Sequence, residues 1–399
     1  MEASLYIHIP FCAYGKCDYC DFYSVPLVSP EPWLSDPRPT RFVDALLSEG
    51  ERLFLKYAPR KIPTIYIGGG TPSVLGPAGI LRLLRGISHI VSRYSPPPLE
   101  ITVEANPESA DEAFLAAARE AGATRLSLGV QTFHGPSRQA IHRGGAALTA
   151  SGQPDCTTLL SRRLSLAAQY FPDAFSADLI SGFPFQDERI LLDDIDALLS
   201  FRPAHVSLYA LTVEPGTPLA ASAGAGDEAD RLWISGRDAL EKAGYGQYEV
   251  SNFCLSHRES RHNIRYWRMQ NWLALGPAAS GTIINEETGT GFRYTIPSDL
   301  DAWLSKTMTD TFFEELDTLT LIKESFLMGF RYLEGPDELL FRQRFRRNIP
   351  DLIPNTVSLW RERGLLRKDK AILTKEGLLF LNPFLLEVFD ELDASFSAC

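Results

Sequence analysis

The chain has 399 residues, of which 45% are hydrophobic, so it can form one large α/β domain with a smaller appendage. Its net charge of −11 argues against a nucleic-acid partner, because proteins that bind phosphate backbones normally present a basic face. We find neither a basic N-terminal stretch nor an apolar run typical of a signal peptide or membrane span. We therefore expect a cytoplasmic protein without stable membrane insertion, whose partners are small molecules or proteins.

Short apolar strands alternate with amphipathic helices along the first half of the chain. The predicted strands are Leu5–Ile9, Thr64–Ile67, Glu100–Val103, Arg125–Leu128, Phe175–Ile180 and His205–Tyr209. The predicted helices are Phe42–Tyr57, Leu81–Tyr94, Asp111–Ala121, Ser161–Tyr170 and Arg189–Phe201. This repeat predicts an α/β fold whose parallel sheet closes wholly or partly into a (β/α)6 barrel, with its chemistry at the carboxyl ends of the strands.

Three of the six cysteines, Cys12, Cys17 and Cys20, lie together in a loop behind the first predicted strand. Disulfide pairing would leave one thiol over, and a reducing compartment disfavours it. A structural zinc site would need a fourth ligand such as His8. An iron–sulfur cluster on three thiolates fits the spacing better and would leave one iron open to a small molecule.

Glycine-rich and polar residues follow or end the other predicted strands. They are Gly69, Gly70, Thr71, Glu104, Gln131 and Asp178, with Arg143 a little further along the chain. Consecutive glycines let the backbone approach a ligand closely, and a strand-end carboxylate such as Glu104 can accept hydrogen bonds from a ribose diol. The remaining amide, cation and acid could orient a zwitterionic amino acid attached to a nucleoside. For Arg143 and Asp178 a surface ion pair is the alternative.

Eight ordered motifs carry a family resemblance. They are YIHIPFC with its C-x-x-C, IGGGTPS, VEANPES, RLSLGVQTF, ADLISGFP, HVSLYALTVEPGT, YEVSNF and HNIRYW. In this order they resemble the radical S-adenosylmethionine proteins related to oxygen-independent coproporphyrinogen III oxidase. Within that group the chain is most similar to the haem chaperones.

The resemblance implies a [4Fe–4S] cluster on Cys12, Cys17 and Cys20, with S-adenosylmethionine on the open iron. The residues it implies around S-adenosylmethionine are Tyr6, Tyr19, Gly69, Gly70, Thr71, Glu104, Gln131, Arg143 and Asp178. The family spaces its first two cysteines by three residues, whereas four separate Cys12 from Cys17 here. We expect cluster binding to survive, because Gly15 allows the loop to bulge.

Two functions follow from this resemblance. The first is a haem chaperone that hands haem to an acceptor protein, and the second is a radical enzyme that oxidatively decarboxylates coproporphyrinogen III or another tetrapyrrole. The oxidases carry a segment ahead of the cluster, whereas only five residues precede Tyr6 here, which favours the chaperone. The family associates HNIRYW with haem, and His262 is a chemically reasonable axial ligand. A hydrogen-bonded loop histidine is the alternative.

The pattern of predicted elements divides the chain into three regions. Residues 1–215 form the predicted partial barrel, with the cluster loop at 8–22. Residues 216–300 extend the barrel and carry HNIRYW, and residues 301–399 form a helical, winged-helix-like domain. The segment LLRKDKAILTKEGLLFL favours a strand, turn, strand and helix. Because the chain is acidic, we expect this domain to act as a lid or partner surface.

Overall fold

Six parallel strands form the centre of the computed structural model, which describes residues 1–13, 15–27, 36–143, 156–221, 227–306 and 311–397. The strands are β1 (Ser4–Ile9), β4 (Thr64–Gly69), β5 (Glu100–Ala105), β6 (Arg125–Gln131), β7 (Phe175–Ser181) and β8 (His205–Ala210). They pair in that order, all parallel. At its end β8 pairs with a further antiparallel strand instead of closing onto β1. The predicted partial (β/α)6 barrel is therefore confirmed.

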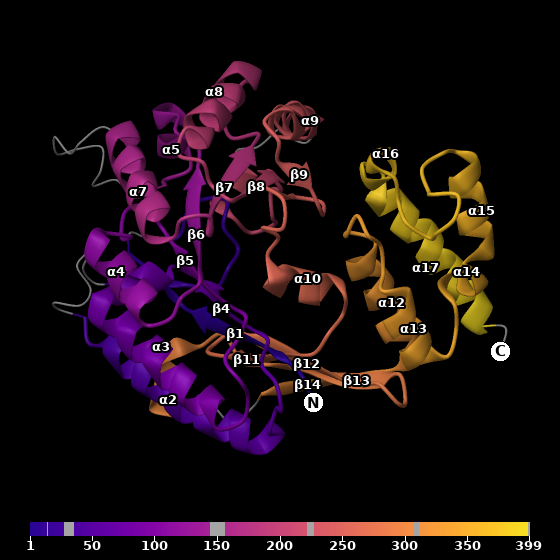
Figure 1. The fold of residues 1–399 in the computed structure, drawn as a ribbon, viewed down its shortest axis with the longest axis horizontal. Coiled ribbons are helices and arrows are strands. Elements are labelled where there is room, and N and C mark those ends of the chain that lie inside the picture. The colour runs from indigo at the N-terminus through magenta and orange to yellow at the C-terminus, as the bar shows by residue number, and fades with distance from the viewer. Residues whose placement is uncertain (14, 28–35, 144–155, 222–226, 307–310, 398–399) are drawn as a thin grey trace.

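Helices cover the outer face of this sheet (Figure 1). They are α2 (Arg38–Tyr57), α3 (Gly76–Ser92), α4 (Glu112–Glu120), α5 (Gly135–Ala140), α7 (Cys156–Tyr170) and α8 (Glu188–Leu199). Alternate strand residues such as Leu5 and Val103 join helical residues such as Phe42 and Leu83 in one apolar core. The stretch Pro72–Ser92 is long and apolar enough to cross a membrane by length and composition, but half of it is buried, as in a core helix.

The inner face of the barrel is polar. Tyr6 lies opposite Tyr66, Tyr66 opposite Thr102, and Thr102 opposite Arg125, so that these four residues form one layer across four strands. Because side chains alternate between the two faces of a strand, the same periodicity that buries leucine and isoleucine under the helices directs these polar groups inward. The short helix α10 (Arg261–Trp267) lies on this concave side in Figure 1.

The central sheet continues beyond the barrel at both edges. On the β1 side, β11 (Trp272–Leu275) is parallel to β1, and β12 (Ser280–Asn285), β13 (Thr290–Thr295) and β14 (Phe312–Leu316) follow antiparallel. On the β8 side lie β10 (Asn252–Cys254) and β9 (Gly246–Gln247). The other elements up to residue 306 are β2 (Phe11–Cys12), β3 (Val25–Pro26), two short 3-10 helices at Pro72–Leu75 and Pro218–Ala221, α9 (Asp227–Lys242) and α11 (Leu300–Ser305).

The C-terminal part is helical and has a core of its own. Its helices are α12 (Thr318–Gly329), α13 (Glu338–Phe345), α14 (Ile349–Leu352), α15 (Pro354–Glu362), α16 (Lys375–Leu378) and α17 (Leu381–Ser397). Phe326, Trp360 and Phe384 are buried at its centre. Between α15 and α16, Leu366 and Leu373 form one antiparallel bridge where the sequence predicts a hairpin. The predicted limits at residues 215 and 300 stay predictions.

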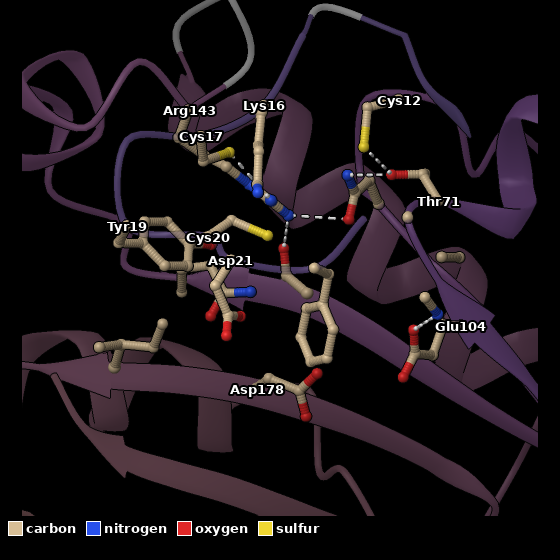
Figure 2. A pocket seen from close by; sticks show the side chains of 18 of the residues that line it. Cys12, Lys16, Cys17, Tyr19, Cys20, Asp21, Thr71, Glu104, Arg143 and Asp178 are labelled. Atoms are coloured by element: carbon tan, nitrogen blue, oxygen red, sulfur yellow. Dashed lines mark hydrogen bonds between the residues drawn. The ribbon is translucent and has the colours of Figure 1, made fainter. Parts of the chain in front are cut away.

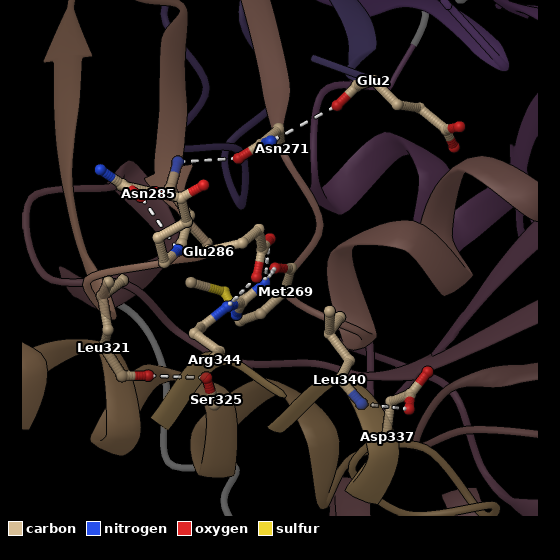
Figure 3. Close-up of polar contacts among 12 residues, drawn as sticks. Glu2, Met269, Asn271, Asn285, Glu286, Leu321, Ser325, Asp337, Leu340 and Arg344 are labelled. Atoms are coloured by element: carbon tan, nitrogen blue, oxygen red, sulfur yellow. Dashed lines mark hydrogen bonds and ion pairs between the residues drawn. The ribbon is translucent and has the colours of Figure 1, made fainter. Parts of the chain in front are cut away.

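A buried arginine ties this helical part to the sheet (Figure 3). Arg344 of α13 donates two hydrogen bonds of 2.8 Å to the Glu286 carboxylate and one of 3.0 Å to the Met269 carbonyl oxygen. Glu286 follows β12, and Met269 follows α10. One side chain therefore joins three segments that are distant in the sequence.

Candidate functional site

A cavity of about 440 Å³ opens at the carboxyl ends of the parallel strands. It is lined by most of the residues that the sequence predicts to bind cofactors: Cys12, Cys17, Tyr19, Cys20, Gly69, Gly70, Thr71, Glu104, Gln131, Arg143 and Asp178. Figure 2 shows eight of these side chains gathered around the same space, namely Cys12, Cys17, Tyr19, Cys20, Thr71, Glu104, Arg143 and Asp178. The rule that βα chemistry gathers where parallel strands end therefore predicts their location correctly.

The three cysteines come from the loop that follows β1. Cys12 ends β2, whose short pairing with β3 holds the start of the loop. Cys20 donates a backbone hydrogen bond of 3.0 Å to the carbonyl oxygen of Cys17. Between Cys12 and Cys17, Gly15 has a φ of +89° and open space where a Cβ would lie. The extra residue between Cys12 and Cys17 is thus accompanied by the left-handed glycine that the bulge requires.

Two of the thiols lie against polar side chains from other loops. Cys12 Sγ is 3.6 Å from Thr71 Oγ1, and Cys17 Sγ is 3.6 Å from Arg143 Nη1. Asn106 links these contacts, because its amide nitrogen donates to Thr71 Oγ1 (3.0 Å) and its oxygen accepts from Arg143 Nη2 (2.9 Å). The guanidinium beside Cys17 is the kind of neighbour that stabilises a thiolate. Burial raises the pKa of the third thiol, Cys20, to about 11.

The glycine turn after β4 forms one wall of the cavity. Gly69 has a φ of +103°, and a Cβ there would overlap the His8 ring. A Cβ on Gly70 would lie 2.5 Å from the Phe11 carbonyl oxygen. The backbone N–H groups of Gly70 and Thr71 donate to Ile9 and Phe11, which brings this turn against the base of the cysteine loop. The close approach requires glycine at both positions.

Glu104 and Asp178 place two buried carboxyl groups on the cavity wall. Glu104 accepts a hydrogen bond of 2.6 Å from the Tyr66 hydroxyl and one of 3.2 Å from the Gly69 backbone N–H. Burial raises the pKa of Glu104 to about 7, although the Tyr66 hydrogen bond opposes this shift and the nearby Asp178 adds to it. Burial likewise raises the pKa of Asp178, against hydrogen bonds from Ser207 and Ser127. Asp178 therefore lines the cavity, whereas the alternative interpretation places it in a surface ion pair.

Gln131 reaches the cavity through a distortion of β6. The register between β6 and β7 shifts between Gly129 and Gln131, and Gln131 has a φ of +71°. A bulge of this kind turns a side chain away from its regular direction, and a left-handed glutamine costs energy that a functional site commonly tolerates. Its Oε1 is buried without a hydrogen-bond partner among the described residues.

Two predicted residues lie outside the described lining of the cavity. The Tyr6 hydroxyl is 3.0 Å from His8 Nδ1. His262 is the second residue of α10 and is only 1% exposed, near the opposite ends of the strands, with its Nδ1 2.8 Å from Thr64 Oγ1. The backbone N–H of His262 donates to Glu100, which stabilises the start of the helix. Contacts of Tyr6 with S-adenosylmethionine and of His262 with haem stay predictions.

The structure adds two residues that the sequence did not single out. Asn106, in the VEANPES motif, joins Thr71 to Arg143, and Tyr66 supports Glu104. Asn106 follows a strand directly, so the strand-end rule could have marked it. Tyr66 lies inside a strand, and only its alternation with Ile65 and Ile67 indicates an inward direction.

The residues around the cavity fit an iron–sulfur cluster with a polar nucleoside ligand. Cys12, Cys17 and Cys20 are free cysteines. Within the described residues no three His, Cys, Asp or Glu side chains could share a single metal ion, whereas thiolates of a [4Fe–4S] cluster each bind a separate iron. Two buried polar atoms on the wall, Gln131 Oε1 and Arg143 Nε, lack hydrogen-bond partners among the described residues, and such atoms call for a ligand.

Comparisons with known proteins agree with this geometry. The model of the Radical SAM superfamily matches residues 6–148. The heme chaperone HemW of Buchnera aphidicola subsp. Acyrthosiphon pisum is 31% identical and covers 97% of this chain and 98% of its own. The heme chaperone HemW of Mycobacterium tuberculosis is 33% identical over 94% of this chain and 92% of its own. The mitochondrial radical S-adenosyl methionine domain-containing protein 1 of Mus musculus is 32% identical over 96% and 82%.

A solved structure shares the fold. Coproporphyrinogen III oxidase (HemN) from Escherichia coli has a TM-score of 0.73 and covers 97% of this chain and 89% of its own, at 19% identity. At that identity the match shows the architecture alone.

Proposed function

This chain belongs to the HemW family of radical S-adenosylmethionine proteins, and on that premise we propose that it is a haem chaperone that binds haem and transfers it to an acceptor protein. The observation that carries the proposal is the end-to-end match to HemW proteins, on a chain whose cysteines, glycine turn and unpartnered polar atoms meet in one cavity. The use of thiols near the surface suits the reducing cytoplasm in which we place the protein.

We assign the cavity to a [4Fe–4S] cluster and S-adenosylmethionine. Cys12, Cys17 and Cys20 would hold the cluster, with Arg143 beside Cys17 compensating its negative charge. Glu104 would accept hydrogen bonds from the ribose hydroxyls. Gln131 would use its unpartnered oxygen on the same ligand. Together the two cofactors supply one-electron chemistry.

His262 is the axial haem ligand that we propose to test first. Thr64 Oγ1 donates its single hydrogen to Ser4 Oγ, so the hydrogen between Thr64 and His262 belongs to Nδ1 of the imidazole. Nε2 therefore carries a lone pair, and it is buried without a partner among the described residues. Because His262 is only 1% exposed, coordination of haem there requires α10 to move away from the barrel.

The proposal is tested by an anaerobic haemin titration of the cluster-loaded protein, followed in the Soret band, with His262→Ala beside the wild type. We expect saturable binding of one haem per chain. A weaker Soret band in the variant supports His262 as the axial ligand. An unchanged band would mean that another residue coordinates the haem. Transfer is measured by adding an apo-haem protein as acceptor.

The competing function is an oxidase of the coproporphyrinogen type. It is tested by incubating the same protein with coproporphyrinogen III, S-adenosylmethionine and a reductant without oxygen. If decarboxylated product forms and haem does not bind specifically, the proposed function changes from haem chaperone to radical enzyme.

A further inference from the structure

One contact inside the barrel supports the cavity wall from below. Tyr66 lies in the middle of β4, and its side chain is outside the cavity lining. Its hydroxyl donates a 2.6 Å hydrogen bond to Oε1 of Glu104, which does line the cavity. Figure 2 shows the Glu104 carboxylate at the edge of the space that the cysteines and Arg143 surround.

The Tyr66 ring is held from two sides. It stacks on Tyr6, with ring centroids 6.3 Å apart and an interplanar angle of 28°. On another side it meets His262 of α10, with a centroid separation of 5.1 Å. A ring packed in this way has little rotational freedom, so the position of its hydroxyl is fixed before any ligand arrives.

Within the described part of the chain, each oxygen of Glu104 thereby has one hydrogen-bond donor. Oε1 accepts from Tyr66, and Oε2 accepts from the Gly69 backbone N–H. A carboxylate oxygen can accept two hydrogen bonds, so each keeps one free position. Two free positions held in a fixed orientation match the two adjacent hydroxyls of a ribose.

We propose that Tyr66 is a positioning residue for S-adenosylmethionine, and that the Tyr66 hydrogen bond favours the ionised carboxylate of Glu104 and orients it toward the ribose diol. The inference rests on the proposed cofactor and deepens it, because Tyr66 acts through Glu104 and does not itself touch the ligand.

The charges around Glu104 make this role measurable by pH. Asp178 on β7 disfavours its ionised form, whereas Tyr66 on β4 and Arg125 on β6 favour it. Tyr6 on β1 and Tyr209 on β8 also face it and stay neutral, because burial raises the pKa of both. Since the pKa of Glu104 is about 7, loss of the Tyr66 hydroxyl would raise it further and leave the carboxyl mostly protonated at neutral pH.

The test is the affinity of the cluster-loaded protein for S-adenosylmethionine, measured by anaerobic calorimetry at about pH 6, 7, 8 and 9. The variants are Tyr66→Phe, Glu104→Gln and, as a matched control, Tyr294→Phe. Tyr294 also has a buried, hydrogen-bonded hydroxyl, which bonds to Ala274 away from the cavity. Iron content and circular dichroism of each variant report cluster loading and folding.

We expect Tyr66→Phe to weaken binding about tenfold near pH 7 and by much less at pH 9, where Glu104 is ionised in both proteins. In a protein that already carries Glu104→Gln, Tyr66→Phe should cause no pH-dependent change in the affinity for S-adenosylmethionine. Tyr294→Phe should bind as the wild type. An effect of Tyr66→Phe that is absent, or equal at every pH, would overturn the inference while the cofactor assignment stands. Failure of the wild type to bind S-adenosylmethionine would overturn the cofactor assignment itself.

Discussion

At the scale of single residues, the cavity is organised by Asn106 and Arg143. Asn106 uses its amide nitrogen and oxygen on Thr71 and Arg143, so two side chains from different loops have fixed positions beside the thiols. Arg143 donates in addition to the Gly129 carbonyl oxygen at 2.6 Å, while its Nε has no partner among the described residues. The guanidinium is thus oriented by the protein, and its Nε–H donor is available for a ligand.

Replacement of one cluster thiol should eliminate the cluster. We predict that Cys17→Ser abolishes retention of iron and sulfide, because the hydroxyl that replaces the thiolate is a poor iron ligand. The measurement is iron and sulfide content after anaerobic reconstitution. Cys254→Ser is the control, since Cys254 is buried in β10 outside the cavity lining. Full iron content in Cys17→Ser would refute the cluster assignment.

His262 should make the protein sensitive to acid. Burial lowers its pKa to about 3, whereas an unfolded histidine titrates near its ordinary value of about 6.5. Unfolding therefore takes up a proton in this window, and the free energy of unfolding should fall as the pH drops from about 6.5 toward 3. His262 contributes at most about 1.4 kcal/mol per pH unit.

The measurement for His262 is urea unfolding of the wild type and His262→Gln across this pH window. The unfolding free energy of the variant should depend less steeply on pH than that of the wild type. Part of the dependence should remain, because burial also lowers the pKa of His205. Equal slopes in the two proteins would contradict a neutral, buried His262.

At the scale of elements, the bulge in β6 places the Gln131 side chain at a cost in backbone strain. In Gln131→Gly the strain of the φ of +71° disappears, but the unfolded chain gains conformational freedom. These effects oppose each other, so we predict a free energy of unfolding within about 1 kcal/mol of the wild type. Affinity for S-adenosylmethionine should fall, because the unpartnered amide oxygen is lost.

Gln131→Val provides the comparison for the bulge. A β-branched side chain tolerates a positive φ poorly, so this variant should lose about 1 to 3 kcal/mol of unfolding free energy. The measurements are urea unfolding and ligand affinity. If Gln131→Gly binds S-adenosylmethionine as tightly as the wild type, the side chain has no part in the site.

The parallel strands and their helices could be predicted from the sequence, because each is a local pattern of apolar periodicity. The extension of the sheet by β11 to β14 could not be predicted in this way. Its strands pair with one another across turns, and β11 pairs with β1, which is distant in the chain. For the site, a position near a strand end indicated Glu104, whereas Asp178 lies in the middle of β7. Strand-end position could not find Tyr66, whose contact with Glu104 depends on the register of two strands. His262, which the alternative interpretation placed in a loop, is instead a buried residue in the first turn of a helix, held by a Glu100 that no local pattern connects to it.

At the scale of the whole molecule, the chain forms two large apolar cores with a polar connection between them. The first fills the space between the parallel sheet and its outer helices, and the second lies among α12 to α17. In Figure 1 the C-terminal helices stand beside the concave side of the sheet, where α10 lies. Because α10 meets both β4 and α12, a displacement of the C-terminal helices would reach the inner face of the barrel.

Arg344 should control how firmly these two parts are joined. Its side chain is 2% exposed, and its partner Glu286 is 44% exposed, so Arg344→Met leaves a carboxylate that water can solvate and a buried Met269 carbonyl without its donor. We predict a loss of about 2 to 3 kcal/mol in the unfolding free energy of the C-terminal core. Calorimetry should then resolve an early transition of the C-terminal helices, while the barrel keeps its cluster.

Arg363→Met is the matched control for this change. Arg363 belongs to the same part of the molecule, but its side chain is 46% exposed and its Nη1 lies 3.4 Å from Glu387, so its removal should change stability by less than about 1 kcal/mol. A single transition in Arg344→Met at the midpoint of the wild type would mean that apolar packing alone joins the two parts. An early transition in Arg344→Met but not in Arg363→Met would show that the buried Arg344 contact stabilises the C-terminal helices against the sheet. Substitution of Arg344 would then be the way to test whether a more mobile α10 binds haem more readily.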